Sequence, residues 1–508
     1  MPSRDDLFSL IHSLTKAEKA WFKKFADINA DGKNTNYMLL YDAIDQMNEY
    51  DEDKLKKSFS RKLNKQVTAE IFNYTHHYLH SLILKSLYNF HSDDTDYHRL
   101  HVWMNEISIL FSKSLYNDCE KLLRRIKKIA KEQERFALLM HILPWQRKLV
   151  EAHAYRDLKD KDFKAMGKEE LFVLKQHEQL IKLSQLSNEL VYVQKRKGTP
   201  AKKTLHQFYD GTLKELNEDK PDFLSVKAEV QYHHILATIW FGKREFENAL
   251  AHMSHMLGLY FLNPEIVRDE EQRLLGGLNN VLTLCVDLQR WNVFDDYLGR
   301  MNDLSTKEPY RGNANFQIRL FERLTAFQLR AFIDRGKIKD AVALIPVIEN
   351  KISSWQNEMG AVHLIQIYFH LAIACVMNEN IDEAHRWLRK LQTESDQNLR
   401  KDLHAYARII ELIIQFELGN TELLDSIVRS AERQFTQQSQ LTQYEKVLFR
   451  FFRKELPSLT NKKEKQQGFK KLSTDHSKAM EQSENSAPVI EKMVESWCTL
   501  RSNVPNFS

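Results

Sequence analysis

The stretch from Asn378 to Leu391, NENIDEAHRWLRKL, decides the fold because its pattern recurs along the chain. Its polar opening is typical of a tight turn, and the apolar residues after it keep the 3.6-residue period of an amphipathic helix. Ile381 can fill the space between two antiparallel helices next to their turn, and Ala384 is small enough to let the helices approach closely. The stretch therefore predicts the turn and the second helix of a helical hairpin.

Five segments share this pattern, namely REFENA, QRWNVF, GKIKDA, ENIDEA and GNTELL, and SLYNDC, which ends at Cys119, is an isolated sixth. Their last residues are Ala249, Phe294, Ala341, Ala384 and Leu424, which lie 45, 47, 43 and 40 residues apart. A small or apolar residue also stands twelve positions before each of them, at Ala237, Leu282, Leu329, Ala372 and Leu412. One hairpin cannot bury its own apolar face, so repetition at this period predicts a stack of helix pairs.

These segments resemble tetratricopeptide-type repeats, in which a Gly/Asp-aromatic-x-x-Ala turn joins two helices, and RGKIKDA and NENIDEA match best. They depart from the family in length, because its repeat has about 34 residues, and Phe294 and Leu424 replace the small residue. The resemblance implies an all-α fold, an α-solenoid with repeats of 40–47 residues. The N-terminal LTKAEKAWFKKFA and NYMLLYDAI also resemble the opening of a group of bacterial helical proteins, and that resemblance implies no activity.

The composition favours long helices with short connections. The chain of 508 residues is 43% hydrophobic, enough for a substantial core, and it has only 14 glycines and 10 prolines. The two types together usually make up roughly 12% of a protein. We expect an N-terminal helical domain over 1–96, irregular basic hairpins over 97–203 and the repeat array over 204–456. A mostly mobile polar tail with a short C-terminal helix is expected over 457–508.

Charge and cysteine usage indicate the compartment. The net charge is +5, and an excess of nine basic residues falls between His101 and Lys203. The four cysteines form no CxxC pair, which favours buried thiols in a reducing environment. The N-terminus has no signal-peptide pattern, and no apolar run reaches the roughly 18 residues of a membrane span. We therefore expect a cytoplasmic protein without a membrane partner.

The sequence gives little reason to expect catalysis. None of the glycines forms the G-x-G or Walker pattern of a nucleotide site, and G-x-S-x-G and H-E-x-x-H are also missing. Six histidines fall between positions 76 and 101, where His76 and His80 stand one helical turn apart, a spacing that can serve a metal. Surface and semi-buried packing is the favoured interpretation of that cluster, and also of the pairs His233/His234 and His252/His255. We predict no enzyme, no metal and no cofactor.

A basic helical face offers a different function. Lys121, Arg124, Lys128 and Lys131 are spaced to follow one side of a helix, and such a stripe can bind the phosphates of a nucleic acid. A solvated helix face explains the same pattern. Nucleic-acid binding by residues 101–203 is therefore an alternative, and a peptide-sensing regulator with a target-binding N-terminal bundle is another.

The preferred function follows from the resemblance, because the first helix of each tetratricopeptide-like pair lines a concave face that binds a peptide or a partner protein. We predict a non-enzymatic protein- or peptide-binding scaffold, whose arginines and amides suit an extended peptide. The predicted groove residues are Gln231, His234, Thr238, Asn279, Thr283, Arg323, Arg330, Gln366 and His370.

Overall fold

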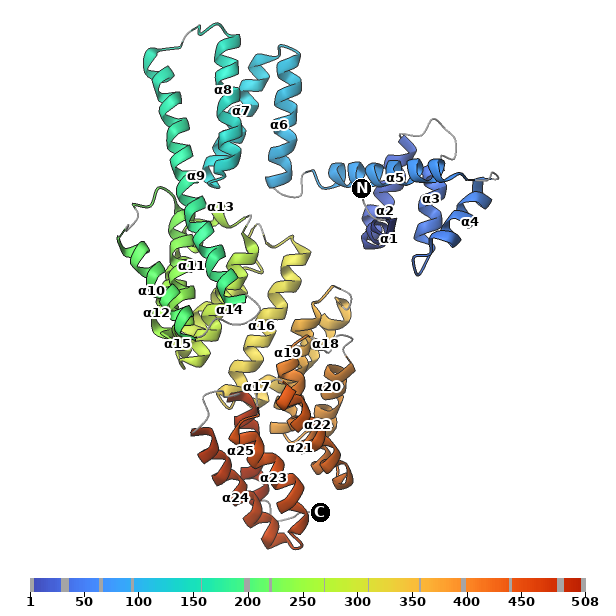
Figure 1. Ribbon diagram of the computed structural model, residues 1–508, viewed down its shortest axis with the longest axis vertical. Coiled ribbons are helices and arrows are strands. Elements are labelled where there is room, and N and C mark those ends of the chain that lie inside the picture. The colour runs from blue at the N-terminus through green and yellow to red at the C-terminus, as the bar shows by residue number, and fades with distance from the viewer. Residues whose placement is uncertain are drawn as a thin grey trace. The chain divides into compact units, whose positions relative to one another are not determined.

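The computed structural model describes residues 4–28, 36–63, 67–92, 96–156, 158–195, 202–218, 222–268, 270–308, 310–355, 358–393, 399–437, 441–481 and 488–503. Within these ranges the regular elements are helices and none is a strand, which confirms the all-α prediction (Figure 1). The chain forms two compact units. Unit 1 comprises Met1–Lys182 and Phe223–Ala228, and unit 2 comprises Leu183–Asp222 and Glu229–Ser508. Most of the charged stretch KRKGTPAKK at 195–203, which precedes the predicted start of the repeat array, lies outside the described residues.

The N-terminal part of unit 1 consists of α1 (Arg4–Ser13), α2 (Lys16–Ile28), α3 (Asn36–Asp45), α4 (Glu52–Leu63) and α5 (Ala69–Phe90). Thr15 and Glu18 form a capping box at the start of α2. The Thr15 amide donates to Glu18 at 2.7 Å, and the Glu18 amide donates to the Thr15 hydroxyl at 3.2 Å. Phe22, Phe59 and Phe72 are fully buried and help to form the core of this part.

Helix α5 buries only part of its apolar residues. Its apolar positions in the sequence pattern include Ile71, Tyr74, Tyr78, Leu82 and Leu87. Leu82 is buried and Leu87 is half-buried, but Ile71, Tyr74 and Tyr78 are 45%, 73% and 41% exposed. The buried side contains Phe72, Leu79, Leu82 and Ile83, together with smaller and polar residues. A long helix rich in apolar and aromatic residues has two plausible faces, and only packing partners decide between them.

The second core of unit 1 belongs to α6 (Asp96–Ser112), α7 (Tyr116–Glu132), α8 (Phe136–Ala152) and the start of α9 (Asp160–Lys195). Helix α7 packs against α6 and α8. Ile107, Cys119, Ile126 and Ile142 are fully buried there.

Unit 2 contains the segments that are predicted to be repeats. Its helices after α10 (Lys202–Glu218) are α11 (Val226–Gly242), α12 (Phe246–Leu262), α13 (Pro264–Val267), α14 (Glu271–Asp287), α15 (Trp291–Asp303), α16 (Ala314–Asp334), α17 (Ile338–Ala343), α18 (Ile345–Ser354), α19 (Ala361–Met377), α20 (Ile381–Thr393), α21 (Lys401–Glu417) and α22 (Leu424–Gln437). Each of α14, α19 and α21 packs against the helix that follows it, and α14, α16, α19 and α21 also contact one another in succession.

The recurring turn has the same backbone geometry in every copy. Its first residue adopts a left-handed conformation, with φ of 59° at Ser114, 64° at Arg244, 55° at Gln289, 70° at Gly336, 58° at Glu379 and 79° at Gly419. The next amide bonds back to a carbonyl five residues earlier, as from Asn380 to Cys375 at 2.9 Å and from Lys337 to Phe332 at 2.8 Å. This is the Schellman arrangement that ends a helix. Glu134 and Ala154, with φ of 47° and 52°, begin further turns of this kind, in which the next amide bonds back to Ala130 and to Val150.

The aligned positions are buried as predicted. Ala249, Phe294, Ala341, Ala384 and Leu424 are at most 4% exposed, and so are the five residues twelve positions earlier. Ala384 itself has no exposed surface, and it begins the apolar face that continues in Trp387 and Leu388. These residues belong to the large core cluster of unit 2.

We expect Ala384→Leu to destabilise unit 2 by about 1–3 kcal/mol, because extra methylenes in a well-packed core force strained side chains or backbone shifts. Chemical unfolding followed by far-ultraviolet circular dichroism measures the change. His385→Gln, at the neighbouring half-buried position, is the control, and we expect it to change the free energy of unfolding by less than about 0.5 kcal/mol. An equal effect of both variants would contradict the close-packing role of Ala384.

The C-terminal segment differs from its prediction as a mostly mobile polar tail. After α23 (Gln443–Arg450), residues Lys462–Glu481 form α24 and Pro488–Asn503 form α25, and the two helices pack against each other. Phe469 and Leu472 of α24 are buried, because a narrow stripe of apolar residues in a polar sequence is enough to dock a helix. The predicted short C-terminal helix is present as α25.

Candidate protein-binding surface

Helix α11 carries three of the predicted groove residues. Gln231 is buried, and its side-chain oxygen accepts a hydrogen bond of 3.0 Å from Arg273 of α14. His234 is half-buried, and its pKa is lowered first by burial and then by the charge of Arg273. The hydroxyl of Thr238 donates to the carbonyl of His234 at 2.8 Å. The side-chain oxygen of Gln231 and the hydroxyl of Thr238 are thus engaged within the fold.

Helix α14 carries Asn279 and Thr283, which are both half-buried. The Thr283 hydroxyl donates to the Asn279 carbonyl at 2.8 Å, one turn earlier in the same helix. Like Thr238, Thr283 therefore directs its hydroxyl to its own backbone.

Helix α16 carries the two predicted arginines. Arg323 donates to the carbonyl of Arg319 at 2.9 Å, and burial lowers its pKa. Arg330 forms an ion pair of 2.8 Å with Asp334 and lies 4.0 Å from Asp287 of α14. Both arginines are half-buried, so they contribute to a charged seam between helices as well as to the surface.

Helix α19 carries Gln366 and His370, which stand one turn apart. Gln366 is half-buried, whereas His370 is only 4% exposed and cannot present its ring to a partner. Burial lowers the pKa of His370 to about 3, and the nearby charges of Arg330 and Arg400 act in the same direction. The imidazole is therefore neutral at physiological pH.

The C-terminal helix α25 lies against the helices that carry the predicted groove residues. It packs against α16 and α19, and Lys492 donates to the main-chain oxygen of Asp334 at 2.6 Å. Farther along α25, Arg501 and Trp497 donate to Glu417, the last residue of α21, at 2.7 and 2.6 Å. Helix α25 thus reaches the first helices of three consecutive pairs.

The face that α25 buries is apolar and aromatic. Its buried apolar residues, each at most 5% exposed, are Val489, Ile490, Met493, Val494, Trp497 and Cys498, and Glu491 is also buried, at 5%. The Trp497 ring stacks on Phe452 at 5.7 Å between centroids and meets Phe469 edge-on at 5.0 Å. Because Asp334 pairs with both Arg330 and Lys492, this end of the predicted groove is occupied by the chain's own helix.

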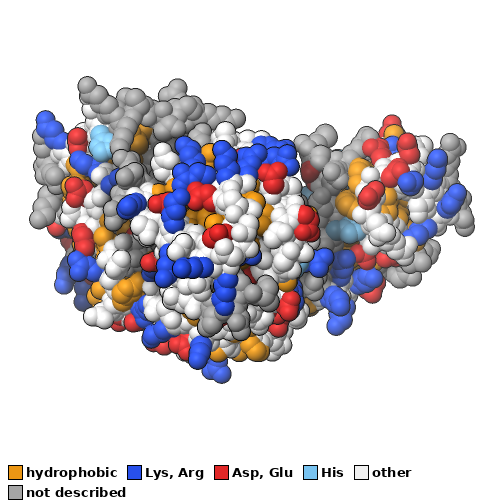
Figure 2. Space-filling view, turned by 90° about the horizontal axis from the view of Figure 1, so that it is seen from below, with side chains coloured by type: hydrophobic (Ala, Val, Ile, Leu, Met, Phe, Trp, Pro, Cys, Tyr) orange, Lys and Arg blue, Asp and Glu red, His pale blue; other side chains and the backbone are white. Residues whose placement is uncertain are grey.

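The basic face of α7 in unit 1 is balanced by acidic side chains. Its ion pairs are Lys121–Asp118 at 3.2 Å, Arg124–Glu120 at 2.6 Å, Lys128–Glu132 at 3.9 Å and Lys131–Glu169. Figure 2 draws a face on which a band of lysine and arginine lies next to aspartate and glutamate. This pairing reduces the positive potential that phosphate binding would need.

The predicted histidine cluster does not assemble a ligand set among the described residues. His76 is buried in α5 and His80 is half-buried, while Asp93 and Asp94 lie outside the described residues. In the described part of the chain, three potential ligands meet instead at Glu229, His233 and His255.

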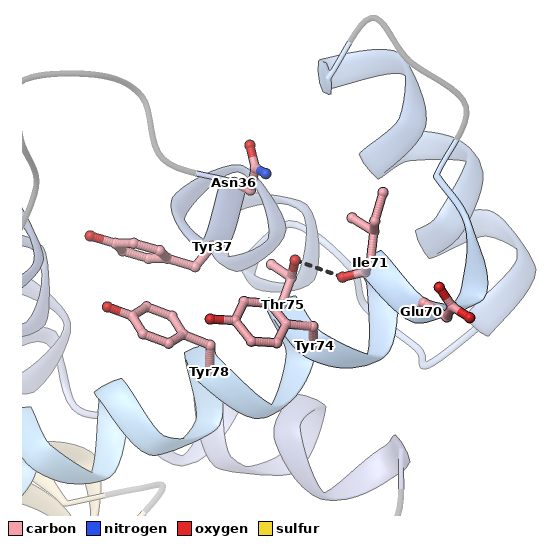
Figure 3. A pocket seen from close by; sticks show the side chains of 7 residues that line it. All are labelled: Asn36, Tyr37, Glu70, Ile71, Tyr74, Thr75 and Tyr78. Carbon is pink, nitrogen blue, oxygen red and sulfur yellow. Dashed lines mark hydrogen bonds between the residues drawn. The ribbon is translucent and has the colours of Figure 1, made fainter.

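A tyrosine-lined pocket of about 800 Å³ lies between α3 and α5 (Figure 3). Tyr37 and Tyr78 approach to 5.2 Å between ring centroids, and Tyr74 stacks near Tyr78 at 6.4 Å. The Thr75 hydroxyl donates to the Ile71 carbonyl at 2.8 Å, so its proton is already engaged within the helix. By sequence spacing alone, Tyr74 and Tyr78 are apolar positions of α5, and the spacing gives no sign of a pocket.

None of the described helices is both long and apolar enough to cross a bilayer. Comparisons of the chain with protein-family models, with curated proteins and with solved structures find no match.

Proposed function

We propose that the chain is a non-enzymatic scaffold, a tetratricopeptide-like α-solenoid whose first-helix face binds an amphipathic helix of a partner protein. The observation that carries the proposal is α25, an amphipathic helix that lies across α16 and α19 and reaches α21. A surface that buries one such helix has the shape and chemistry to receive another. The succession of contacts among α14, α16, α19 and α21 supports the stacked arrangement.

Helix α25 also indicates what the partner helix should look like. Its apolar face is flanked by two cations, Lys492 and Arg501, which meet the carboxylates of Asp334 and Glu417. Trp497 lies between these cations in the sequence and is buried. A partner should therefore present a central aromatic residue and basic residues about two and a half helical turns apart.

The test compares two full-length chains. Met493→Asp together with Val494→Asp places carboxylates in the apolar interface of α25 and should release that helix. A fluorescent peptide of residues 488–503 should then bind the substituted chain at least tenfold more tightly than the wild-type chain, whose own α25 competes. Fluorescence anisotropy measures the binding, and far-ultraviolet circular dichroism checks that the remaining helices persist.

The matched control is the same peptide with Lys492→Glu, which should lose affinity because it faces Asp334 with a like charge. The proposal fails if the substituted chain stays folded and does not bind the wild-type peptide. It also fails if that chain binds both peptides with equal affinity. Displacement of α25 by a partner would also provide the switch that a peptide-sensing regulator needs. The ion pairs of α7 do not favour the nucleic-acid alternative.

A further inference from the structure

A group of imidazoles and a carboxylate lies at one side of the α11–α12 hairpin in unit 2. Glu229 and His233 stand one turn apart on α11, and His252 and His255 stand one turn apart on α12. The two helices are joined by the turn at Arg244, so they bring these four side chains to the same level. By sequence pattern alone, these histidines are interpreted as packing or rim residues.

The distances within the group are short. His255 Nε2 lies 3.3 Å from Glu229 Oε1, and the rings of His233 and His255 are 4.1 Å apart between centroids. Glu229, His233 and His255 each place one nitrogen or oxygen within 4.8 Å of the other two. With zinc–ligand bonds of about 2.0–2.2 Å, the donors of a tetrahedral site lie roughly 3.3–3.5 Å apart. Small side-chain adjustments would bring all three to one ion.

We propose that Glu229, His233 and His255 bind a divalent transition-metal ion, with Zn²⁺ as the best fit. Two imidazole nitrogens and one carboxylate oxygen form a ligand set that zinc accepts, and they leave a fourth position for water or for a group from a partner. The set is partly accessible, because Glu229 and His233 are half-buried and the His255 side chain is 51% exposed.

His252 completes the arrangement as a positioning residue. Its Nδ1 lies 2.9 Å from Nδ1 of His233, within hydrogen-bond distance. When His233 donates this bond, its lone pair is on Nε2, and a second hydrogen bond of this kind commonly orients a metal-binding imidazole.

Without a metal, the same contacts are a hydrogen-bonded histidine cluster, and the experiment must separate the two. The full chain, freed of metal by chelation, is titrated with Zn²⁺ by isothermal calorimetry. We expect one tight site per chain. Co²⁺ in its place should give the intense visible absorption of a four-coordinate centre.

Three substitutions test the assignment. His255→Gln and Glu229→Gln should each weaken Zn²⁺ binding by more than tenfold, and His252→Gln should weaken it less because it acts through His233. His385→Gln, which changes a half-buried histidine on α20, should leave the affinity unchanged. Circular dichroism of each variant shows whether the fold is retained.

Zn²⁺ should also raise the melting temperature of the wild-type chain and not that of His255→Gln, because a ligand that binds only the folded state stabilises it. No saturable binding by the wild type would overturn the proposal, and so would binding that survives the combined His233→Asn and His255→Gln substitutions. The result is independent of the helix-binding test, since neither α25 nor its contacts on α16 and α21 include these residues.

Discussion

Replacing Trp497 by alanine should destabilise the C-terminal part of unit 2 by about 3–5 kcal/mol, the usual cost of truncating a buried tryptophan. The side chain is 4% exposed and is in contact with the rings of Phe416, Phe452 and Phe469. Its removal opens a cavity among three aromatic rings, and these rings cannot all move to fill it. The loss should appear in chemical unfolding and, locally, in faster hydrogen exchange of residues 488–503.

The Trp497 hydrogen bond adds a polar contribution. The indole N–H donates to Glu417 at 2.6 Å, and the Glu417 side chain is only 7% exposed. Trp497→Phe keeps most of the ring contacts but removes this donor, so it should cost about 1–2 kcal/mol. Arg501 still pairs with Glu417 in that variant. If Trp497→Ala costs no more than Trp497→Phe, the aromatic packing of α25 is not what holds it in place.

Mild acid should destabilise unit 2 through two buried histidines, His370 and His476. Burial lowers their pKa values to about 3 and about 4. In the unfolded chain both titrate near 6.5. Above that pH neither state binds the proton and stability is unaffected. As the pH falls below 6.5, the two histidines bind protons in the unfolded state but not in the folded state. The free energy of unfolding therefore falls until the pH reaches the pKa of the folded state. At about pH 5 the loss is about 2 kcal/mol for each histidine.

His476→Leu isolates one of these contributions. The ring is 1% exposed, packs edge-on against Tyr444 at 5.1 Å, and leaves Nε2 buried without a hydrogen-bond partner among the described residues. Leucine suits such a site, so the variant should be about as stable as the wild type at pH 7.5 or more so. Between about pH 7.5 and pH 5 it should lose about 2 kcal/mol less than the wild type. Parallel curves for the two proteins would show that His476 titrates normally in the folded state.

Local pattern was enough to predict the hairpins but not how their faces are used. The turn and its two packing positions lie within thirteen residues, so a single sequence predicts that Ala384 and Ala372 are buried. The burial of Gln231 and His370 depends on helices far along the chain, and sequence spacing on α11 or α19 cannot reveal it. The same holds for α25, because its docking on α16 depends on Lys492 meeting Asp334 across 158 residues.

The histidine group was closer to being predictable. His233 and His255 each stand eleven residues from Arg244, the centre of the turn. In an antiparallel hairpin, residues equally distant from the turn face each other, so the turn position alone sets this register. The polar composition of α24 led to the prediction of a mobile tail. Its buried stripe of Phe469, Leu472 and His476 has helical spacing but contains few apolar residues, so the sequence pattern is weak.

The left-handed turns also bear on how the repeats can diverge. Serine, arginine, glutamine and glutamate occupy the position that glycine takes in two copies, although a side chain there costs roughly 1 kcal/mol. The backbone hydrogen bond and the buried residue five positions later hold the conformation whatever the side chain. Copies of the unit can therefore drift apart in sequence while remaining superimposable in backbone, and the turn position tolerates mutation more readily than the alanine that follows it.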